Sequence, residues 1–375
     1  MRKKTNRRKF IEKSLASIAG VSAVSSCVNA PEDKVKESIN INFNKNYKWK
    51  MVTTWSPNMP VLGEGCNMFS EWVRKMSGGR LEIKVYGGGE LIPSLESFDA
   101  VSNGAIEMGS GASYYWAGKI PSGQFFSSVP FGMNSKQMNS WIISGGGYKL
   151  YREIYEPFNL IPFVGGNTSM QMGGWFNKEI NSLDDLNGLK IRMPGLGGEV
   201  LRKVGAAAVA IPGGEIFSSL KSGAIDATEW VGPWNDLSLA FYQAAQYYYW
   251  PGFHEPGAGL ATGINLDTWN SFTLSEQSII RQVLAYENTY TLAEFNHHNA
   301  IALDTLINKH KVKMRTFSDE IMSELKVISE GVIEEVSTRT EISKRIFNSF
   351  KDSMKRLNDW SSKSEQAYMK ARSIK

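Results

Sequence analysis

Short segments in which apolar and polar residues alternate recur along the middle of this chain, separated by segments with helical spacing. Alternation with a period of two is typical of a strand with one buried face. The segments that we interpret as strands are residues 49–55, 81–87, 163–169, 174–177, 189–195, 207–211 and 260–265. Strands that alternate with helices predict an α/β fold.

Two helix-to-strand segments in different halves of the chain share a sequence pattern. Residues 96–107 (ESFDAVSNGAIE) and 215–226 (EIFSSLKSGAID) both contain an apolar pair three residues apart, followed by Gly-Ala-Ile and an acidic residue. A Gly in this place suits the end of a helix. The strands that precede them, LEIKVYG at 81–87 and LKIRMPG at 189–195, also look alike. We interpret the pattern as a strand, helix and strand that occur once in each of two lobes.

The last hundred or so residues have a helical pattern. Residues 275–310 contain no Gly or Pro, and a helix of about that length would reach about 50 Å. Such a helix runs across both lobes or reaches a neighbouring subunit, and residues 318–372 predict further amphipathic helices. We expect lobe I to comprise residues 47–168 and about 229–258, lobe II about 169–228 and 259–274, and residues 275–375 to pack across the lobes or onto a dimer partner.

Residues 1–30 have the composition of an export leader, with a basic head, a short apolar middle and small residues at the end. The pair Arg7-Arg8 is typical of a twin-arginine signal. Cys27 follows Val-Ser-Ser as in a lipobox, which predicts lipidation of its thiol; the alternative is cleavage after Ala30. The polar residues 31–46 predict a flexible tether.

The basic character of the chain comes from its leader. Residues 1–26 hold seven of the 42 Lys and Arg residues and one of the 37 Asp and Glu residues, so the remainder has 35 basic and 36 acidic residues and a net charge of −1. This balance gives no indication of nucleic-acid binding. The other cysteine, Cys66, has helical spacing with apolar residues and predicts a buried thiol.

The order of these features resembles that of the extracytoplasmic solute-binding proteins of tripartite ATP-independent periplasmic (TRAP) transporters, the C4-dicarboxylate-binding-protein-like (DctP) family. Within that family it is similar to the branch that binds 2-oxo and 2-hydroxy acids with a metal ion. The resemblance covers about residues 49–372, and the segments that carry it are LEIKVYGGGEL, SNGAIEMGSGASYYWAGKIP, LNGLKIRMPGLGGEVLRKVGA, IPGGEIFSSLKSGAIDATEWVGPWND and HEPGAGLATGINLDTW.

The resemblance implies a two-lobed α/β periplasmic binding protein fold with hinge strands, a long inter-lobe helix and a helical C-terminal tail. It also implies capture of a small 2-oxo or 2-hydroxy monocarboxylate, such as pyruvate, 2-oxobutyrate or lactate, for delivery to the membrane subunits of a TRAP permease. A homodimer is implied as well. The alternatives are a dicarboxylate, a sugar acid or an aromatic acid as ligand, or a sensor that acts on a membrane receptor.

Arg192 in GLKIRMPG is the first candidate for binding the ligand. Strand alternation places it on the polar face, where it is either a solvated arginine or a ligand-binding one. The resemblance favours the second role, because a planar guanidinium can make two parallel hydrogen bonds to a carboxylate.

Glu229 and Trp230 form an unusual pair in a segment with few charges. A protein carboxylate beside a carboxylate ligand would repel it unless a cation lies between them. By resemblance, the side chains of Gln171, Glu229 and Glu255 and the backbone carbonyl of Trp230 hold one Na⁺ or Ca²⁺ that bridges protein and ligand. All these donors are oxygens, which hard cations prefer.

Aromatic residues complete the expected site. Trp230 offers an indole wall, and either Tyr114 or Tyr115 faces the ligand, with Asn167 and Trp175 as further candidates. We expect no enzyme activity, since the sequence contains no G-x-S-x-G, H-E-x-x-H or Cys/His cluster. His254 and Glu255 could form an acid/base pair, but neighbours in a strand point to opposite faces.

Overall fold

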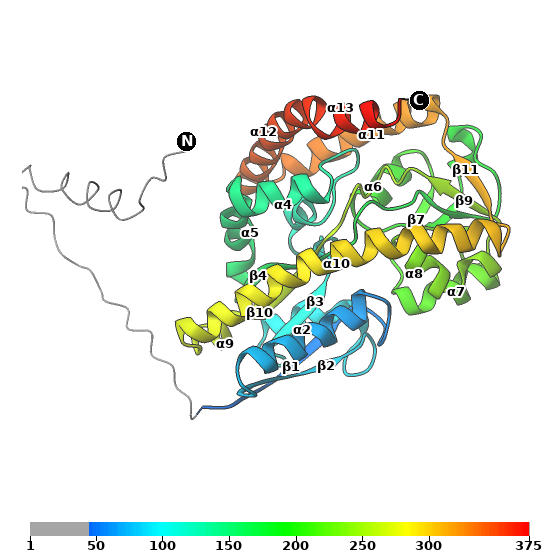
Figure 1. Ribbon diagram of the computed structural model, residues 1–375. Coiled ribbons are helices and arrows are strands. Elements are labelled where there is room, and N and C mark those ends of the chain that lie inside the picture. The colour runs from blue at the N-terminus through cyan, green and yellow to red at the C-terminus, as the bar shows by residue number, and fades with distance from the viewer. Residues whose placement is uncertain (1–44, 375) are drawn as a thin grey trace, which may run out of the picture. The chain divides into compact units, whose positions relative to one another are not determined.

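Two β-sheets organise residues 45–374, the part of the chain that this computed structural model describes (Figure 1). The strands of the first sheet are β1 (Tyr47–Thr53), β2 (Leu81–Tyr86), β3 (Met108–Gly111), β4 (Leu160–Asn167) and β10 (Gly259–Asn265). Those of the second are β5 (Gly174–Phe176), β6 (Lys190–Arg192), β7 (Ala207–Val209), β8 (Ala227–Thr228), β9 (Tyr247–Trp250) and β11 (Lys313–Thr316). The expected α/β architecture is confirmed, whereas the predicted leader, Cys27 and the tether up to residue 44 lie outside the described residues.

Each sheet is covered by helices on its faces. The helices of the first half are α2 (Leu62–Met76), α3 (Ser97–Ser102), α4 (Ser135–Ser144) and α5 (Gly147–Tyr155). Those that follow are α6 (Gly195–Lys203), α7 (Gly213–Ser222), α8 (Pro233–Ser238), α9 (Leu266–Asn270) and α10 (Leu274–Asn308). No helix within residues 45–374 is long and apolar enough to cross a bilayer.

The two sheets have the same strand arrangement. The first has the order β2-β1-β3-β10-β4, and the second has β7-β6-β8-β5-β9 followed by β11 at its edge. In both, the first three strands are parallel, and the next two are antiparallel to their neighbours. The unit β1-α2-β2-α3-β3 therefore corresponds to β6-α6-β7-α7-β8.

This correspondence confirms one half of the sequence repeat and corrects the other. The helix-to-strand segments match α3–β3 and α7–β8, and Gly104 and Gly223 after the two helices have φ angles of 78° and 76°. The match between LEIKVYG and LKIRMPG is wrong, because β2 is an edge strand whose counterpart is β7, and β6 corresponds to β1. Both strands alternate apolar and charged residues, but the exposed positions of β2 are Glu82 and Lys84, whereas Arg192 of β6 is buried. Alternation by itself cannot distinguish an edge strand from an inner strand.

The expected lobe boundaries need a second correction. Residues 247–250 form β9 and pair with β5 and β11 in the second sheet, so the predicted placement of 229–258 in lobe I is wrong. Residues 259–265 form β10 and pair with β3 and β4 in the first sheet, not in lobe II. The chain crosses between the sheets at the loops 168–173 and 251–258, and a third time through α10, which leads from β10 to β11. β10 is almost entirely buried and β9 is buried at two of its four residues, and neither side-chain pattern reveals which sheet holds the strand.

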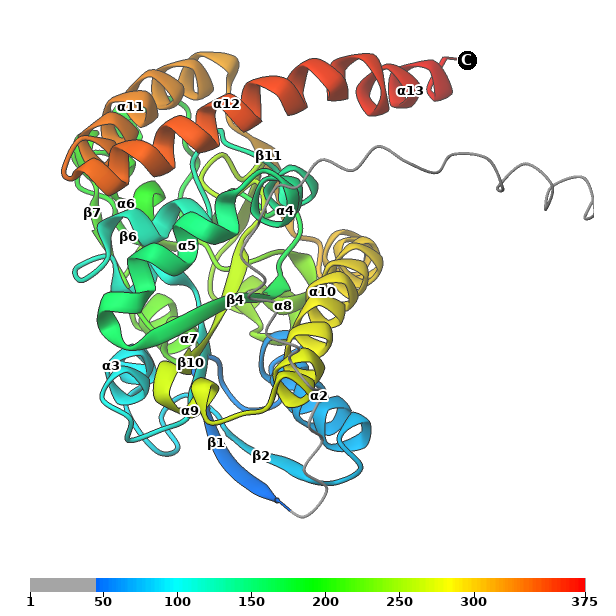
Figure 2. The ribbon, with the colours of Figure 1, turned by 90° about the vertical axis from the view of Figure 1, so that its left-hand side faces the viewer.

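Helix α10 spans both lobes, which is one of the two arrangements that its length predicts. It has 35 residues, and Thr273 and Glu276 form a capping box at its start. It packs against β4 and α2 on one side and against α8 on the other, and Figures 1 and 2 show it running along both parts. Because Phe295 is fully buried against Trp234 of α8, with ring centroids 6.0 Å apart, the helix ties the second sheet to the first.

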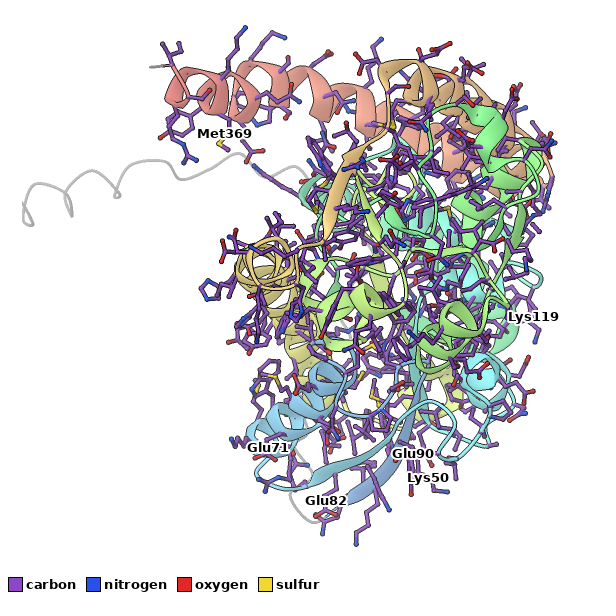
Figure 3. The ribbon with its side chains drawn as sticks, turned by 90° about the vertical axis from the view of Figure 1, so that its right-hand side faces the viewer. Lys50, Glu71, Glu82, Glu90, Lys119 and Met369 are labelled. Atoms are coloured by element: carbon purple, nitrogen blue, oxygen red, sulfur yellow. The ribbon has the colours of Figure 1, made fainter. Side chains whose placement is uncertain are left out.

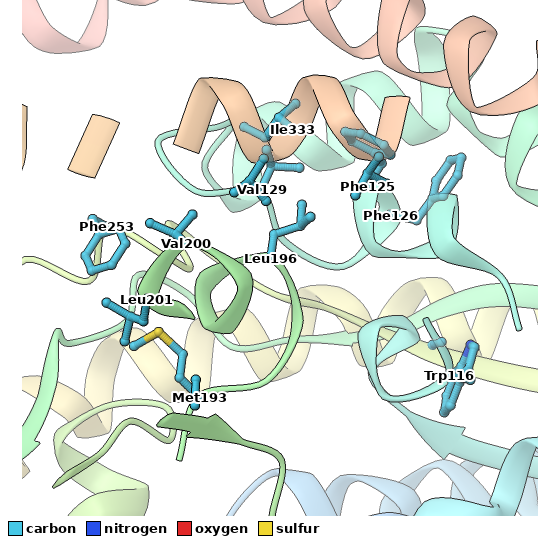
Figure 4. Packing of buried hydrophobic residues seen from close by; sticks show 14 of the residues in the cluster. Trp116, Phe125, Phe126, Val129, Met193, Leu196, Val200, Leu201, Phe253 and Ile333 are labelled. Carbon is cyan, nitrogen blue, oxygen red and sulfur yellow. The ribbon is translucent and has the colours of Figure 1, made fainter. Parts of the chain in front are cut away.

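The C-terminal helices cover the remaining faces. They are α11 (Asp319–Ser337), α12 (Glu341–Lys363) and α13 (Glu365–Arg372). Ile333 of α11 packs over Leu196 and Val200 of α6 (Figure 4), and α12 packs on α4 and α5. Cys66 on α2 is a buried free thiol, as predicted, and burial raises its pKa.

Candidate functional site

Six segments meet between the two sheets around the side chain of Arg192. Four of them follow the carboxyl ends of parallel strands, namely β1, β3, β6 and β8, where α/β proteins commonly bind ligands. The other two are the crossing segments 168–173 and 251–258. The residues that they contribute are Trp55, Tyr114, Tyr115, Gln171, Arg192, Glu229, Trp230, His254 and Glu255.

Arg192 is almost completely buried, with 1% of its surface exposed. Its Nη1 forms an ion pair with Glu229 Oε1, its Nη2 donates to the hydroxyl of Tyr115 at 2.9 Å, and its Nε donates to the carbonyl of Ile211 at 3.1 Å. The guanidinium lies 4.8 Å from the ring centroid of Trp230. Burial lowers the pKa of Arg192, but Glu229 and the neighbouring hydroxyls outweigh it, so the net shift is upward and the charge is retained.

Glu229 is fully buried, and only one of its carboxylate oxygens is satisfied. Oε1 pairs with Arg192, whereas Oε2 has no hydrogen-bond partner among the described residues. His254 Nε2 lies 3.4 Å from Oε2, without the geometry of a hydrogen bond. A buried carboxylate oxygen without a partner is costly unless another group meets it.

Gln171 and Glu255 connect the two crossing segments. The amide nitrogen of Gln171 donates to Glu255 Oε2 at 2.7 Å and to Thr168 Oγ1 at 3.0 Å, which fixes the amide orientation. Its Oε1 is buried and has no partner within residues 45–374. Burial is the main cause that raises the pKa of Glu255 well above its usual value, and the nearby charge of Glu229 raises it further. Arg192, Tyr114 and Gln171 lower this pKa but do not cancel the rise.

These groups form a set of oxygen donors suited to a hard cation. The unpartnered oxygens of Glu229 and Gln171 and the carboxylate of Glu255 are all buried. Na⁺ and Ca²⁺ accept such carboxylate and amide oxygens. The described part of the chain contains no group of three or more His, Cys, Asp and Glu residues that could hold a metal. The predicted set differs from such a group, because it combines two carboxylates with an amide oxygen and a backbone carbonyl.

Both tyrosines face the cluster, although the sequence offered them as alternatives. Tyr115 accepts the hydrogen bond from Arg192, and Tyr114 lies close enough to Glu255 to affect its pKa. Gly195 has a φ angle of 64°, and a Cβ there would lie 3.0 Å from the Cβ of Tyr114. Gly195 thus allows the entry into α6 and the close packing of this helix start against Tyr114.

Trp55 is a site residue that the sequence analysis missed. Its ring centroid lies 6.1 Å from that of Tyr115 and 6.2 Å from that of Trp230, so Trp55 packs beside the two aromatic residues that contact the guanidinium. Its Nε1 contacts Ser110 Oγ at 3.4 Å. The signal available was its position two residues after β1, the strand that corresponds to β6 with Arg192.

The contacts of Arg192 include neither Asn167 nor Trp175. Asn167, the last residue of β4, uses its Oδ1 to accept from Ser169, and its buried Nδ2 has no partner among the described residues. The Trp175 ring stacks on Tyr248 with centroids 4.1 Å apart, and its Nε1 donates to Asp236 at 3.0 Å. Trp175 therefore supports the buried layer beneath Glu229 and Trp230.

Two α/β lobes of matching topology, joined by two crossing segments around a buried guanidinium, define an extracytoplasmic solute-binding protein of the periplasmic type. The chain belongs to the family of bacterial extracellular solute-binding proteins, family 7 (DctP), which it matches over residues 51–339. The resemblance inferred from the sequence segments is thereby confirmed.

Relatives with described ligands cover nearly the whole chain. A monocarboxylate 2-oxoacid-binding periplasmic protein of Nostoc sp. PCC 7120 is 37% identical over 362 residues, which are 96% of this chain and 98% of that protein. A TRAP solute-binding protein of Pseudoalteromonas atlantica T6c with bound sodium and pyruvate superimposes with a TM-score of 0.85 at 36% identity, covering 88% of this chain and 100% of that one. A Bordetella bronchiseptica RB50 protein, a mixed-occupancy dimer with calcium and picolinate, has a TM-score of 0.86 at 34% identity over 88% and 98% of the two chains.

Asp236 beneath the site is expected to make stability depend on pH. It is 1% exposed, and burial raises its pKa from the ordinary 3.8 to about 7, although the hydrogen bonds from Tyr248 and Trp175 lower it. The folded protein therefore binds the proton more tightly than the unfolded chain, so the stability from this group is lost as pH rises from about 4 to 7.

Replacing Asp236→Asn keeps an oxygen that accepts both hydrogen bonds and removes the titration. We expect the free energy of unfolding of the variant, relative to the wild type, to rise by about 2–4 kcal/mol between pH 4.5 and 7.5, as measured by urea unfolding. The exposed Asp352→Asn variant is the control. A difference that stays constant across this pH range would show that Asp236 titrates normally.

Proposed function

We propose that this protein binds a small 2-oxo or 2-hydroxy monocarboxylate, such as pyruvate, 2-oxobutyrate or lactate, together with one Na⁺ or Ca²⁺, and delivers it to a TRAP permease for uptake. The observation that carries the proposal is the buried guanidinium of Arg192 beside unpartnered buried oxygens of Glu229 and Gln171. The relatives named above, with pyruvate, picolinate, sodium and calcium, support it. The proposed function is binding without chemical turnover, and no residue is assigned a catalytic role.

In this proposal Arg192 holds the carboxylate of the acid in a bidentate pair, and Tyr115 donates or accepts a further hydrogen bond. Gln171, Glu229, Glu255 and the carbonyl of Trp230 hold the cation. Its positive charge allows an anionic acid to bind beside two protein carboxylates. Binding requires an exchange of partners: Arg192 transfers from the carboxylate of Glu229 to that of the acid, and the released carboxylate of Glu229 binds the cation.

The size of the ligand is limited by aromatic walls. Tyr115 and Trp230 contact the guanidinium, and Trp55 packs beside both of them. Aromatic rings exclude water and strengthen the polar contacts behind them. An aromatic acid of the picolinate type is the second candidate ligand, because the Bordetella relative holds picolinate. Pyruvate and picolinate share a carboxylate next to a second donor atom, which is the arrangement that a guanidinium and a cation can bind together.

We further propose a route to the periplasm and a dimer. Arg7-Arg8 would direct export through the twin-arginine pathway, and Cys27 would carry a lipid anchor. The C-terminal helices α12 and α13 carry large exposed apolar side chains, with Trp360 and Tyr368 each 64% and Met369 55% exposed. Figure 2 shows α13 extending away from the packed helices, and Figure 3 shows Met369 at this end of the chain. This placement favours contact with a second copy.

Removing both cations should abolish binding of the acid. After exhaustive chelation in a sodium-free potassium buffer, calorimetric titration with pyruvate is expected to show no saturable binding, because the carboxylates of Glu229 and Glu255 would repel the ligand. Adding Ca²⁺ or Na⁺ should restore binding. Equal pyruvate affinity with and without the cations would exclude the ion-dependent site.

Arg192→Lys tests the guanidinium while retaining a positive charge beside Glu229. We expect the variant to fold and to bind pyruvate more weakly by at least about 2 kcal/mol, because an ammonium cannot form the planar bidentate pair. Arg345→Lys, in an exposed pair with Glu153, is the control. Calorimetry at saturating Ca²⁺ measures the difference, and unchanged affinity would remove Arg192 from the site.

The dimer proposal is tested with Trp360→Ser combined with Tyr368→Ser. The mature protein is expected to elute as a dimer in size-exclusion chromatography with light scattering, and the double variant as a monomer. Lys351→Ser combined with Lys355→Ser on α12 serves as the control. A monomeric mature protein, or a double variant that remains dimeric, would contradict an interface at this end of the chain.

A further inference from the structure

His254 lies on the crossing segment 251–258 and points at the carboxylate of Glu229. The residue is 2% exposed, and its Nε2 lies 3.4 Å from Glu229 Oε2. Within residues 45–374, neither ring nitrogen of His254 nor Oε2 of Glu229 has a hydrogen-bond partner. Three buried polar atoms without partners at one place indicate that this contact tightens when the site is occupied, since native proteins rarely leave such groups unpaired.

The surroundings of His254 keep its ring in this place. Gly197 of α6 lies directly against it, and a Cβ at Gly197 would be 2.7 Å from the Cβ of His254. The neighbouring Phe253 packs against Phe131 and Phe317, with ring centroids 5.7 and 6.3 Å apart. The segment is a loop rather than a strand, and His254 reaches Glu229 instead of forming an acid/base pair with Glu255.

We propose that His254 is a positioning residue for the cation site: its Nε2–H holds Oε2 of Glu229 so that the carboxylate keeps its orientation toward the ion. This inference rests on the proposed function. In the exchange described above, Glu229 gives up Arg192, and the terminal torsion of a glutamate is broad and weakly restrained by itself. A second donor on the opposite oxygen keeps the carboxylate in place, and such outer partners typically contribute 10- to 100-fold in metal affinity.

The contribution of His254 should therefore appear in the affinity for the cation and not in that for the acid. His254→Phe keeps a planar ring and removes the donor, His254→Leu does the same with a smaller side chain, and His254→Gln retains an N–H donor. His297→Phe, at an exposed position on α10, is the control. Thermal unfolding without cations first establishes that each variant is folded.

The experiment measures the Ca²⁺ concentration that half-saturates pyruvate binding, and then the pyruvate affinity at saturating Ca²⁺. We expect His254→Phe or His254→Leu to raise the required Ca²⁺ about 10- to 100-fold, with pyruvate affinity at saturating Ca²⁺ nearly unchanged. His254→Gln is expected to restore most of the loss.

Three results would overturn the inference. One is a calcium requirement of the donor-free variants equal to that of His297→Phe. Another is an equal loss in the donor-free and Gln variants, which would indicate packing alone. The third is a loss of pyruvate affinity that persists at saturating Ca²⁺, which would place His254 in contact with the acid. Pyruvate binding by the wild type that needs no cation would instead overturn the proposed function itself, whatever the variants do.

Discussion

The pairing of the buried Arg192 guanidinium with Glu229 is the interaction on which the site depends. Taking two charged groups out of water costs several kcal/mol for each, and their attraction offsets this only when the remaining hydrogen-bonding positions are also satisfied. Arg192 meets this condition through Tyr115 and the carbonyl of Ile211. Glu229 meets it on one oxygen only. The free energy of the site is therefore sensitive to whatever reaches the second oxygen.

The same cluster couples the two sheets. Arg192 and Glu229 belong to the second sheet, Tyr115 and Trp55 follow strands of the first, and Gln171 and Glu255 lie on the segments that cross between them. A rotation of one sheet against the other would change the distance between Arg192 and Tyr115 and the geometry of both crossing segments. Ligand capture and lobe movement thus act on the same hydrogen bonds, which is how a binding protein converts an occupied site into a shape that a partner can recognise.

The sequence predicted the polar residues of the site better than its walls. Arg192, Gln171, Glu229 and Glu255 converge as expected, but their segments are far apart in the chain, and the resemblance to a family brought them together where spacing could not. Trp55 was missed because an aromatic residue after a strand looks like core. His254 was set aside because its segment was treated as a strand with opposite-facing neighbours, whereas it is a loop. Residues 247–250 and 259–265 were predicted in the wrong lobes for a similar reason, because the side-chain pattern of a strand does not indicate the sheet to which it belongs.

Relatives of this chain hold sodium or calcium, and counting the charges of the proposed site shows how either ion would balance it. With both glutamates ionised, Arg192, Glu229 and Glu255 sum to −1, and a monocarboxylate brings the total to −2, which a divalent ion neutralises. With Glu255 protonated, the three groups sum to zero, the acid brings −1, and a monovalent ion is sufficient. Burial, followed by Glu229, raises the pKa of Glu255 well above its usual value, which favours its protonated form before a cation binds. A single carboxyl on the crossing segment can therefore adjust the charge of the site by one unit, and a buried site favours whichever combination leaves no net charge.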